Sequence, residues 1–171
     1  MRRKLAAASA CSLLTSLAVS ITAAPAFACT NDPLLPGSVA GKEMRYVNGG
    51  TIPETSAAIS NWNALGTIKI LPNAWNTYND VEIADVINPS VSYSELWTQR
   101  TGADTIWINK YCTDKYSSAK RKGVVVHELG HALRLGHTNT PAAVMYCNDD
   151  GRTVYAPSTA DKNKYYSIWG H

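Results

Sequence analysis

Three of the chain's four histidines lie in the segment 127–137, and a glutamate directly follows the first of them. Imidazole nitrogens are common zinc ligands, and residues four apart lie about one turn apart on the same face of an α-helix. His127 and His131 can therefore bind one ion if this segment is helical. Glu128 lies beside that face, where its carboxylate can take a proton from a water at zinc's open position. The segment indicates a hydrolytic zinc site with Glu128 as general base.

The third histidine, His137, follows His131 by six residues and cannot share the face of a helix that continues straight. The helix must therefore end after about Leu133, and the chain must turn back so that His137 completes the ligand set. A core helix with buried histidines is the alternative interpretation. Three histidines at ligand spacing beside an acid favour the metal site.

The segment resembles the metzincin zinc endopeptidases, whose extended motif is H-E-x-x-H-x-x-G-x-x-H followed by a methionine turn. Met145 and Tyr146 follow the third histidine by eight and nine residues, and this pair and residues 158–170 are similar to the matrixin branch. The resemblance implies a small secreted endopeptidase of the bacterial type with one catalytic zinc ion. It also implies that Met145 packs beneath the histidines and that Tyr146 helps to shape a substrate pocket.

Arg134 stands where the family motif has glycine, at the point where the backbone leaves the helix. If Arg134 adopts a left-handed conformation, the strain is on the order of 1 kcal/mol. Gly136 could form the turn instead. The departure affects the expected turn geometry more than the expected ligand set.

Acidic residues offer an alternative third ligand. No glutamate follows Glu128, which excludes the zinc proteases that use a distant glutamate, but Asp149, Asp150 and Asp161 are available. His137 at the family spacing is the simpler choice.

The alternative function is a secreted zinc-binding or adhesion module without catalysis. The intact Glu128 argues against it, because a structural zinc ion normally has a fourth protein ligand.

The first 28 residues have the pattern of a secretory signal peptide. Residues 2–4 are basic, residues 5–21 are largely apolar, and Ala26 and Ala28 place small side chains before a cleavage site. We therefore expect a secreted, extracellular protein in which residues 29–171 form one catalytic domain. No later segment is long and apolar enough to span a bilayer.

The formal charge of +3 belongs to the signal peptide, which contains three basic residues and no acid. The remaining chain has balanced charge, so its composition favours neither nucleic acid nor a membrane as a partner. We expect protein or peptide substrates and a monomeric enzyme. The basic cluster at residues 120–122 is typical of a solvated first helical turn.

Removal of the signal peptide leaves Cys29, Cys112 and Cys147, which allow three different single disulfides. Export favours oxidation, so we expect one bridge. We favour Cys112–Cys147, because these residues flank the zinc helix and the methionine turn and their bridge would brace the site. Cys29 would then be a tether, or a cap on the zinc as in the latent forms of the matrixin family, although the family's flanking motif is absent.

Hydrophobic periodicity predicts the other elements of an α+β domain. A helix is expected from Pro53 to about Leu65, and an edge strand that could bind an extended substrate is expected within residues 91–99. On the metzincin plan, the fold is a single domain with a twisted mixed sheet of about four or five strands and an active-site helix. A small C-terminal lobe contains the methionine turn and a final helix capped by Ser158 and Asp161. Strands are predicted at residues 44–47, 67–71, 80–86 and 105–109.

Metal ions other than one catalytic zinc have little support in the sequence. The only histidine outside the motif is His171, so a second histidine-bound zinc is not expected. Asp80, Glu82 and Asp85 could contribute to a calcium site, but these acids suit an exposed strand face equally well. Calcium is left open.

Overall fold

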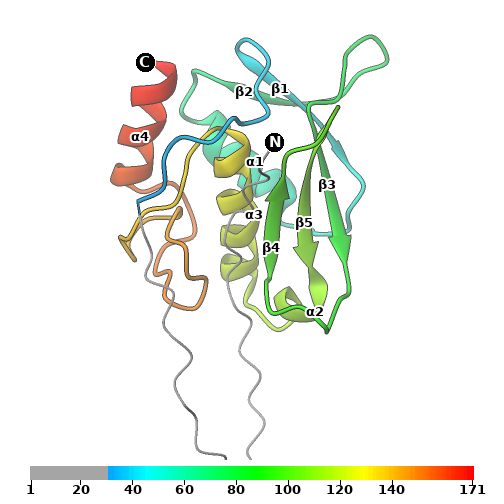
Figure 1. The fold of residues 1–171 in the computed structure, drawn as a ribbon, viewed down its shortest axis with the longest axis vertical. Coiled ribbons are helices and arrows are strands. Elements are labelled where there is room, and N and C mark those ends of the chain that lie inside the picture. Colours follow the sequence, from blue (N-terminus) through cyan, green and yellow to red (C-terminus); the bar gives the residue numbers. More distant parts are fainter. Residues whose placement is uncertain (1–30) are drawn as a thin grey trace, which may run out of the picture.

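A five-stranded mixed sheet with helices packed against it forms the body of the protein (Figure 1). The computed structural model describes residues 31–171, so the predicted signal peptide and Cys29 lie outside the described residues. The strands are β1 (Glu43–Asn48), β2 (Lys69–Pro72), β3 (Val81–Val86), β4 (Glu95–Thr98) and β5 (Asp104–Asn109). The helices are α1 (Thr55–Asn63), α2 (Lys110–Thr113), α3 (Ser118–Ala132) and α4 (Thr159–Trp169).

The sheet has the order β2-β1-β3-β5-β4, and β4 pairs with β5 in the antiparallel direction while the other neighbours are parallel. The register places Ile106 of β5 between Ile83 of β3 and Trp97 of β4, and all three residues are buried. Alternate side chains of a strand point to opposite faces of the sheet. The apolar residues that predicted the strands therefore form the inner face of the sheet.

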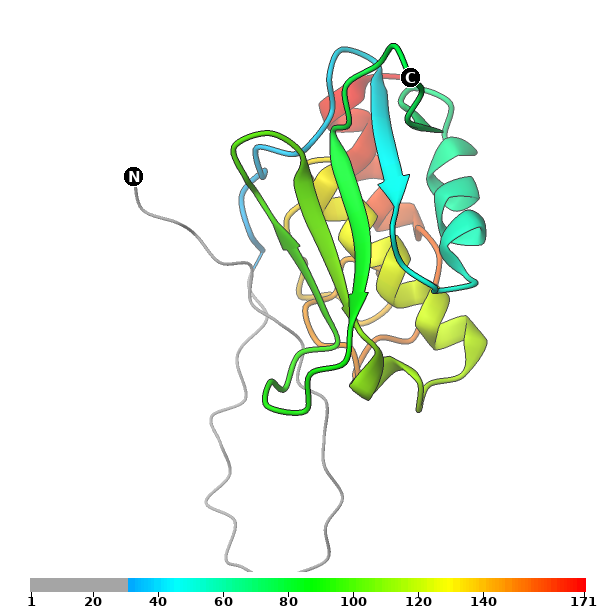
Figure 2. The same cartoon turned by 90° about the vertical axis from the view of Figure 1, so that its right-hand side faces the viewer.

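Helices α1 and α3 cover the same face of the sheet (Figure 2). Trp62 of α1 is buried and donates a hydrogen bond from Nε1 to the carbonyl oxygen of Val126 on α3 at 2.9 Å. Its ring also stacks on Tyr165 of α4, with ring centroids 5.9 Å apart. Trp62 thus joins three helices in the core, and replacing such a side chain by alanine costs about 3–5 kcal/mol.

The structure confirms the main elements predicted from the sequence. Each predicted strand is present within a few residues of its expected bounds, and β4 lies at the sheet edge within residues 91–99. The helix expected to begin at Pro53 is α1, and α3 ends at Ala132, close to the predicted Leu133. Helix α2 was not predicted, because its four residues are too short to show helical periodicity.

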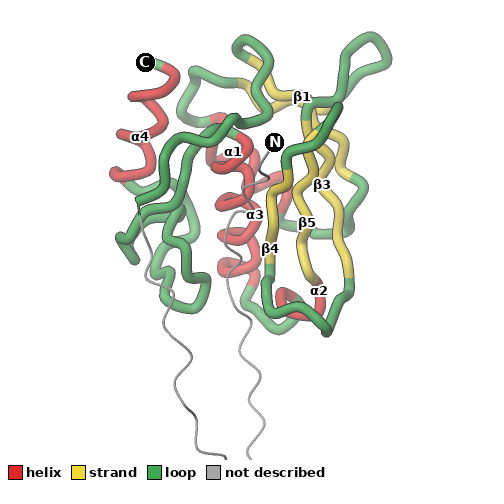
Figure 3. Tube along the Cα trace, viewed as in Figure 1, coloured by secondary structure: helices red, strands yellow, loops and turns green. Residues whose placement is uncertain are grey.

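Residues 138–171 form the small C-terminal lobe that the sequence predicts. Figure 3 shows that loops and turns connect α3 to α4. Helix α4 begins with the predicted capping box, in which the side chains of Ser158 and Asp161 bond to each other's backbone nitrogen. In residues 31–171, no helix combines the length and apolar character needed to cross a membrane.

Candidate active site

The exit of α3 brings the third histidine back toward the helix. Helix α3 ends at Ala132, and Arg134 then adopts a left-handed conformation with φ of 74°. Gly136 has no positive φ; instead, a side chain there would collide with the carbonyl oxygens of Asp32 and Pro33. Of the two positions that the sequence left open for this turn, Arg134 therefore carries the left-handed conformation. The glycine at 136 is explained by close packing.

Three histidine side chains converge at this turn. One ring nitrogen each of His127, His131 and His137 lies within 4.8 Å of the others, and all three residues are buried. The Nε2 atoms of His131 and His137 are 3.2 Å apart. The structure thus brings together the three residues that the sequence predicts as metal ligands.

Hydrogen bonds on the opposite ring nitrogens orient each histidine. His127 Nδ1 lies 2.7 Å from the carbonyl oxygen of Val144, and His131 Nδ1 lies 2.8 Å from that of Leu135. His137 Nδ1 lies 2.7 Å from a carboxylate oxygen of Asp32. These acceptors place the proton on Nδ1 and leave the Nε2 lone pair for a metal ion.

The electrostatics of the cluster also suit a cation. Burial lowers the pKa of His127 and of His137, and it lowers the pKa of His131 to about 3, with the neighbouring histidines acting in the same direction for His127 and His131. The three imidazole rings are therefore uncharged at neutral pH. Neutral rings with Nδ1 protons turn two Nε2 lone pairs toward each other, which is unfavourable unless a cation lies between them. This donor set and its tautomers fit zinc.

Glu128 lies buried next to the histidine cluster. Its carboxylate is within 4.8 Å of donor atoms of His127 and Glu95, and the residue is buried. Burial raises the pKa of Glu128 to about 8, although Arg152 and a hydrogen bond from the backbone of Trp97 act in the opposite direction. Within residues 31–171, Oε2 of Glu128 has no hydrogen-bond partner. This oxygen is therefore available to a reacting group at the histidines.

Arg152 is a buried cation behind Glu128 that sequence analysis did not identify. Its side chain is fully buried and contacts Glu95 at 2.9 Å and Asp149 at 3.5 Å. It also donates to the backbone oxygens of Gly123 and Tyr146. Burial raises the pKa of Glu95 well above its usual value. The negative charges of Asp149 and Glu128 act in the same direction, and Arg152 opposes the rise. Arg152 thus offsets the charge of several carboxyl groups beneath the site.

The methionine turn lies beneath α3, as the sequence predicts. A side chain at Gly130 would collide with the sulfur of the buried Met145, so the helix and the turn are in direct contact. Asp161 accepts hydrogen bonds from the backbone nitrogens of Val144 and Met145 at 2.9 and 3.1 Å. Asp161 therefore fixes the turn in addition to capping α4, a role that its position in the sequence did not reveal.

The acidic alternatives to His137 have other roles. Asp149 contacts Arg152, and Asp150 forms an ion pair with Lys120 at 2.8 Å. Asp161 binds the methionine turn. Among the described residues, none of these acids belongs to a group that could hold a metal ion with the histidines. His137 is the third residue of the cluster.

Tyr146 follows the methionine turn and is partly exposed, and its ring would be contacted by any side chain at Gly151.

The expected Cys112–Cys147 disulfide is not present in the described part of the chain. Cys112 is buried on α2, where its Sγ lies 3.8 Å from the carbonyl oxygen of Tyr93. A disulfide requires the two Cα atoms within about 7 Å, a condition that flanking the same site does not ensure.

The basic cluster at residues 120–122 makes ion pairs within the protein. Arg121 contacts Glu54 at 2.7 Å, which joins α3 to the start of α1. Lys120 lies over the ring of Tyr116 as well as beside Asp150. The start of α3 therefore also contributes contacts within the protein, through Lys120 and Arg121.

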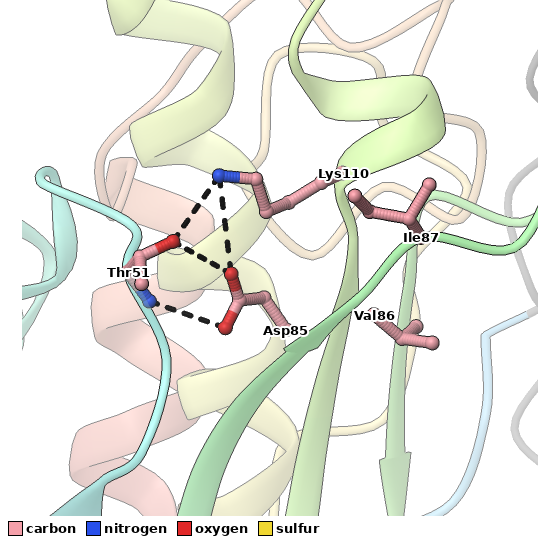
Figure 4. Close-up of a pocket in the computed structure, with 5 residues that line it drawn as sticks. All are labelled: Thr51, Asp85, Val86, Ile87 and Lys110. Atoms are coloured by element: carbon pink, nitrogen blue, oxygen red, sulfur yellow. Dashed lines mark hydrogen bonds and ion pairs between the residues drawn. The ribbon is translucent and has the colours of Figure 1, made fainter.

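The acids considered for calcium do not converge. Asp80 accepts a hydrogen bond from the backbone nitrogen of Arg45 at 2.7 Å. Asp85 accepts hydrogen bonds from Thr51 and lies 3.9 Å from Lys110, in a shallow pocket at the end of the sheet (Figure 4). Within residues 31–171, no metal-binding group includes these carboxylates.

Comparisons with known proteins identify the family. The matrixin family model (Peptidase_M10) matches residues 76–170, which is more than half of the chain. The chain belongs to the matrixin family. A comparison with curated proteins gave no match. Among solved structures, that of myroilysin matches with a TM-score of 0.54 and 11% sequence identity, covering 84% of this chain and 98% of that chain. At this identity, the match shows a shared fold.

This matrixin is therefore a zinc metalloendopeptidase with the metzincin fold that the sequence resemblance implied. The family match includes the whole histidine motif and the methionine turn. Among residues 31–171, the group formed by His127, His131 and His137 fits the family's zinc ion.

Proposed function

We propose that this matrixin is a secreted endopeptidase in which Glu128 is the general base for peptide-bond hydrolysis. One observation carries the proposal. A buried carboxylate directly adjoins three convergent histidines and retains one oxygen without a hydrogen-bond partner among residues 31–171. A carboxylate in this position can exchange a proton with a group held at the histidines.

His127, His131 and His137 would hold a zinc ion as neutral imidazoles, and the bound ion would acidify a water molecule and polarise a peptide carbonyl. Glu128 accepts the proton of the attacking water at Oε2 and later delivers it to the leaving amine. Burial raises the pKa of Glu128 in the metal-free protein, and a bound dication would lower it again, so the group can both accept and return a proton. Arg152 keeps the carboxylate ionisable despite its burial.

Strand β4 is the proposed binding strand for an extended substrate. It lies at the edge of the sheet and packs against α3, and its Trp97 backbone hydrogen-bonds Glu128. A peptide that adds to a sheet edge gains backbone hydrogen bonds irrespective of its sequence. This position would bring the scissile bond toward Glu128, and Tyr146 would line the adjoining pocket.

The proposal of secretion rests on the signal-peptide pattern of residues 1–28. Expression of the full chain in a secreting host, followed by sequencing of the N-terminus of the exported protein, tests it. We expect a first residue of Cys29. Retention of Met1 would contradict secretion by this route, and a start beyond Lys42 would show removal of a longer segment.

The activity is tested with purified exported protein and a mixture of unfolded proteins. Sequencing of the products should reveal internal cleavage sites, and a zinc chelator should abolish cleavage. The Glu128→Gln variant prepared in parallel controls for contaminating proteases. Equal cleavage by the wild type and this variant would contradict the proposal.

A further inference from the structure

We propose that Asp32 is a positioning residue for the zinc ligand His137 and that the N-terminal segment 31–38 is a structural part of the metal centre. The inference rests on the proposed zinc-dependent function. It starts from a difference among the three histidines. His127 and His131 donate from Nδ1 to backbone carbonyl oxygens, whereas the partner of His137 is a carboxylate 2.7 Å away.

His137 needs such a partner more than the other two ligands do. His127 and His131 lie on α3, where the helix and its packing restrict their rings. His137 lies beyond the left-handed turn at Arg134, in a loop. A carboxylate on Nδ1 fixes the tautomer and orientation of a ligating histidine and makes its Nε2 a stronger donor to the metal. Asp32 supplies this interaction from 105 residues earlier in the chain.

The backbone holds Asp32 in place over several residues. Its nitrogen donates to the carbonyl oxygen of His137 at 3.1 Å, so the two residues are joined through both side chain and backbone. Further along, Leu35 donates to Arg134 and Ser38 donates to Ala132, at 3.0 and 2.7 Å. In Figure 1 the blue segment that contains these residues lies beside the chain that leaves α3.

Two other features show that the two segments are fitted to each other. Gly136 has no room for a side chain, because the carbonyl oxygens of Asp32 and Pro33 lie against it. Lys164 of α4 donates to the carbonyl oxygens of both Asp32 and Gly136, at 3.3 and 3.2 Å. The segment 31–38 is therefore clamped to the loop that presents His137. We infer that the mature enzyme retains Asp32 after any processing.

The test measures zinc affinity directly. Wild type, Asp32→Asn and Asp32→Ala are loaded with zinc and titrated with a competing chelator. We expect the alanine variant to bind zinc at least about tenfold more weakly than the wild type, the usual effect of losing a ligand's hydrogen-bond partner. The asparagine variant can still accept the hydrogen bond but lacks the charge, and it should lie between the two. The control is Asp114→Asn, which changes an exposed carboxylate at the C-terminal end of α2 and should leave zinc binding as in the wild type.

A purely structural role would give a different result. Zinc affinity compares the metal-free and metal-bound forms of the folded protein. The loss of a contact that only stabilises the fold therefore lowers the stability of both forms and leaves the affinity unchanged. Zinc affinities of both Asp32 variants within about twofold of the wild type would overturn the inference. If the wild-type protein binds zinc but does not cleave peptides, the result would instead contradict the proposed function.

Discussion

The carboxylate of Asp161 lies 2.9 Å from the backbone nitrogen of Val144, and the carbonyl oxygen of the same Val144 lies 2.7 Å from His127 Nδ1. The start of α4 is thereby linked to a zinc ligand through one residue of the methionine turn. Asp161 is buried, and it also bonds Met145 and Ser158. A single carboxylate thus couples the C-terminal lobe to the active-site helix.

Replacement of Asp161 by asparagine should destabilise the protein by about 2–3 kcal/mol, because a buried charged acceptor of several hydrogen bonds is lost. Urea unfolding of the metal-free protein measures this change. Asp150→Asn is the matched control, since its half-exposed ion pair with Lys120 should contribute at most about 1 kcal/mol. Equal stability of the two variants would show that Asp161 does not hold the turn.

The left-handed Arg134 allows a comparison of strain with side-chain contact. Its Nε donates to the carbonyl oxygen of Leu35 at 3.2 Å, and its guanidinium lies 5.8 Å from the ring of Trp169. Arg134→Ala loses these contacts and keeps the strain, whereas Arg134→Gly loses the contacts and relieves it. We expect the glycine variant to be about 1 kcal/mol more stable than the alanine variant and within about 1 kcal/mol of the wild type. Thermal unfolding of the three proteins checks this order, and loss of stoichiometric zinc from the glycine variant would point to a direct role for the arginine.

The ion pair between Glu54 and Arg121 should make stability depend on pH. Hydrogen bonds from Arg121 lower the pKa of Glu54 below its ordinary value of 4.5. The pair therefore stabilises the fold fully above that value, and its contribution is lost as the pH falls through the lower folded pKa. Glu54→Gln should cost about 2 kcal/mol at pH 7, and the difference from the wild type should shrink below pH 4. A difference that stays constant from pH 7 to pH 3 would contradict an ionic contribution.

The strands and the ligand set could be predicted because both depend on local patterns. Alternation of side chains marks β3 and β5, and the spacing of His127, His131 and His137 follows from helix and turn geometry. The partners of these histidines could not be predicted in the same way. Asp32 and Arg152 are ordinary charged residues in the sequence. Only the fold shows that Asp32 hydrogen-bonds the predicted zinc ligand His137 and that Arg152 is buried among acids. The error at Cys112 has the same cause, because pairing depends on which way α2 buries the sulfur.

Cleavage should decline on the acid side as Glu128 becomes protonated. Burial raises the pKa of Glu128 to about 8 in the metal-free protein, and a bound dication would lower it. A protonated Glu128 cannot accept the water's proton, so kcat/KM should fall with decreasing pH, with an apparent pKa between the ordinary value of 4.5 and about 8. Zinc content is measured at each pH. A profile that stays flat down to pH 4.5 with zinc retained would argue against Glu128 as general base.

The most direct test of the mechanism separates metal binding from proton transfer. Glu128→Gln keeps the size of the side chain and all three histidines, so the variant should retain about one zinc per chain. Its peptide cleavage should nevertheless fall by at least ~10²-fold, the lower end of what a positioned acid or base supplies. His131→Ala, which removes a ligand, should lose both zinc and activity.

Zinc content and kcat/KM of Glu128→Gln are therefore measured on the same preparation. We predict zinc near one per chain together with the loss of cleavage. Near-native turnover with zinc bound would contradict the role of Glu128 as general base. Loss of zinc to the extent seen in His131→Ala would contradict the claim that Glu128 is not needed to bind the zinc ion.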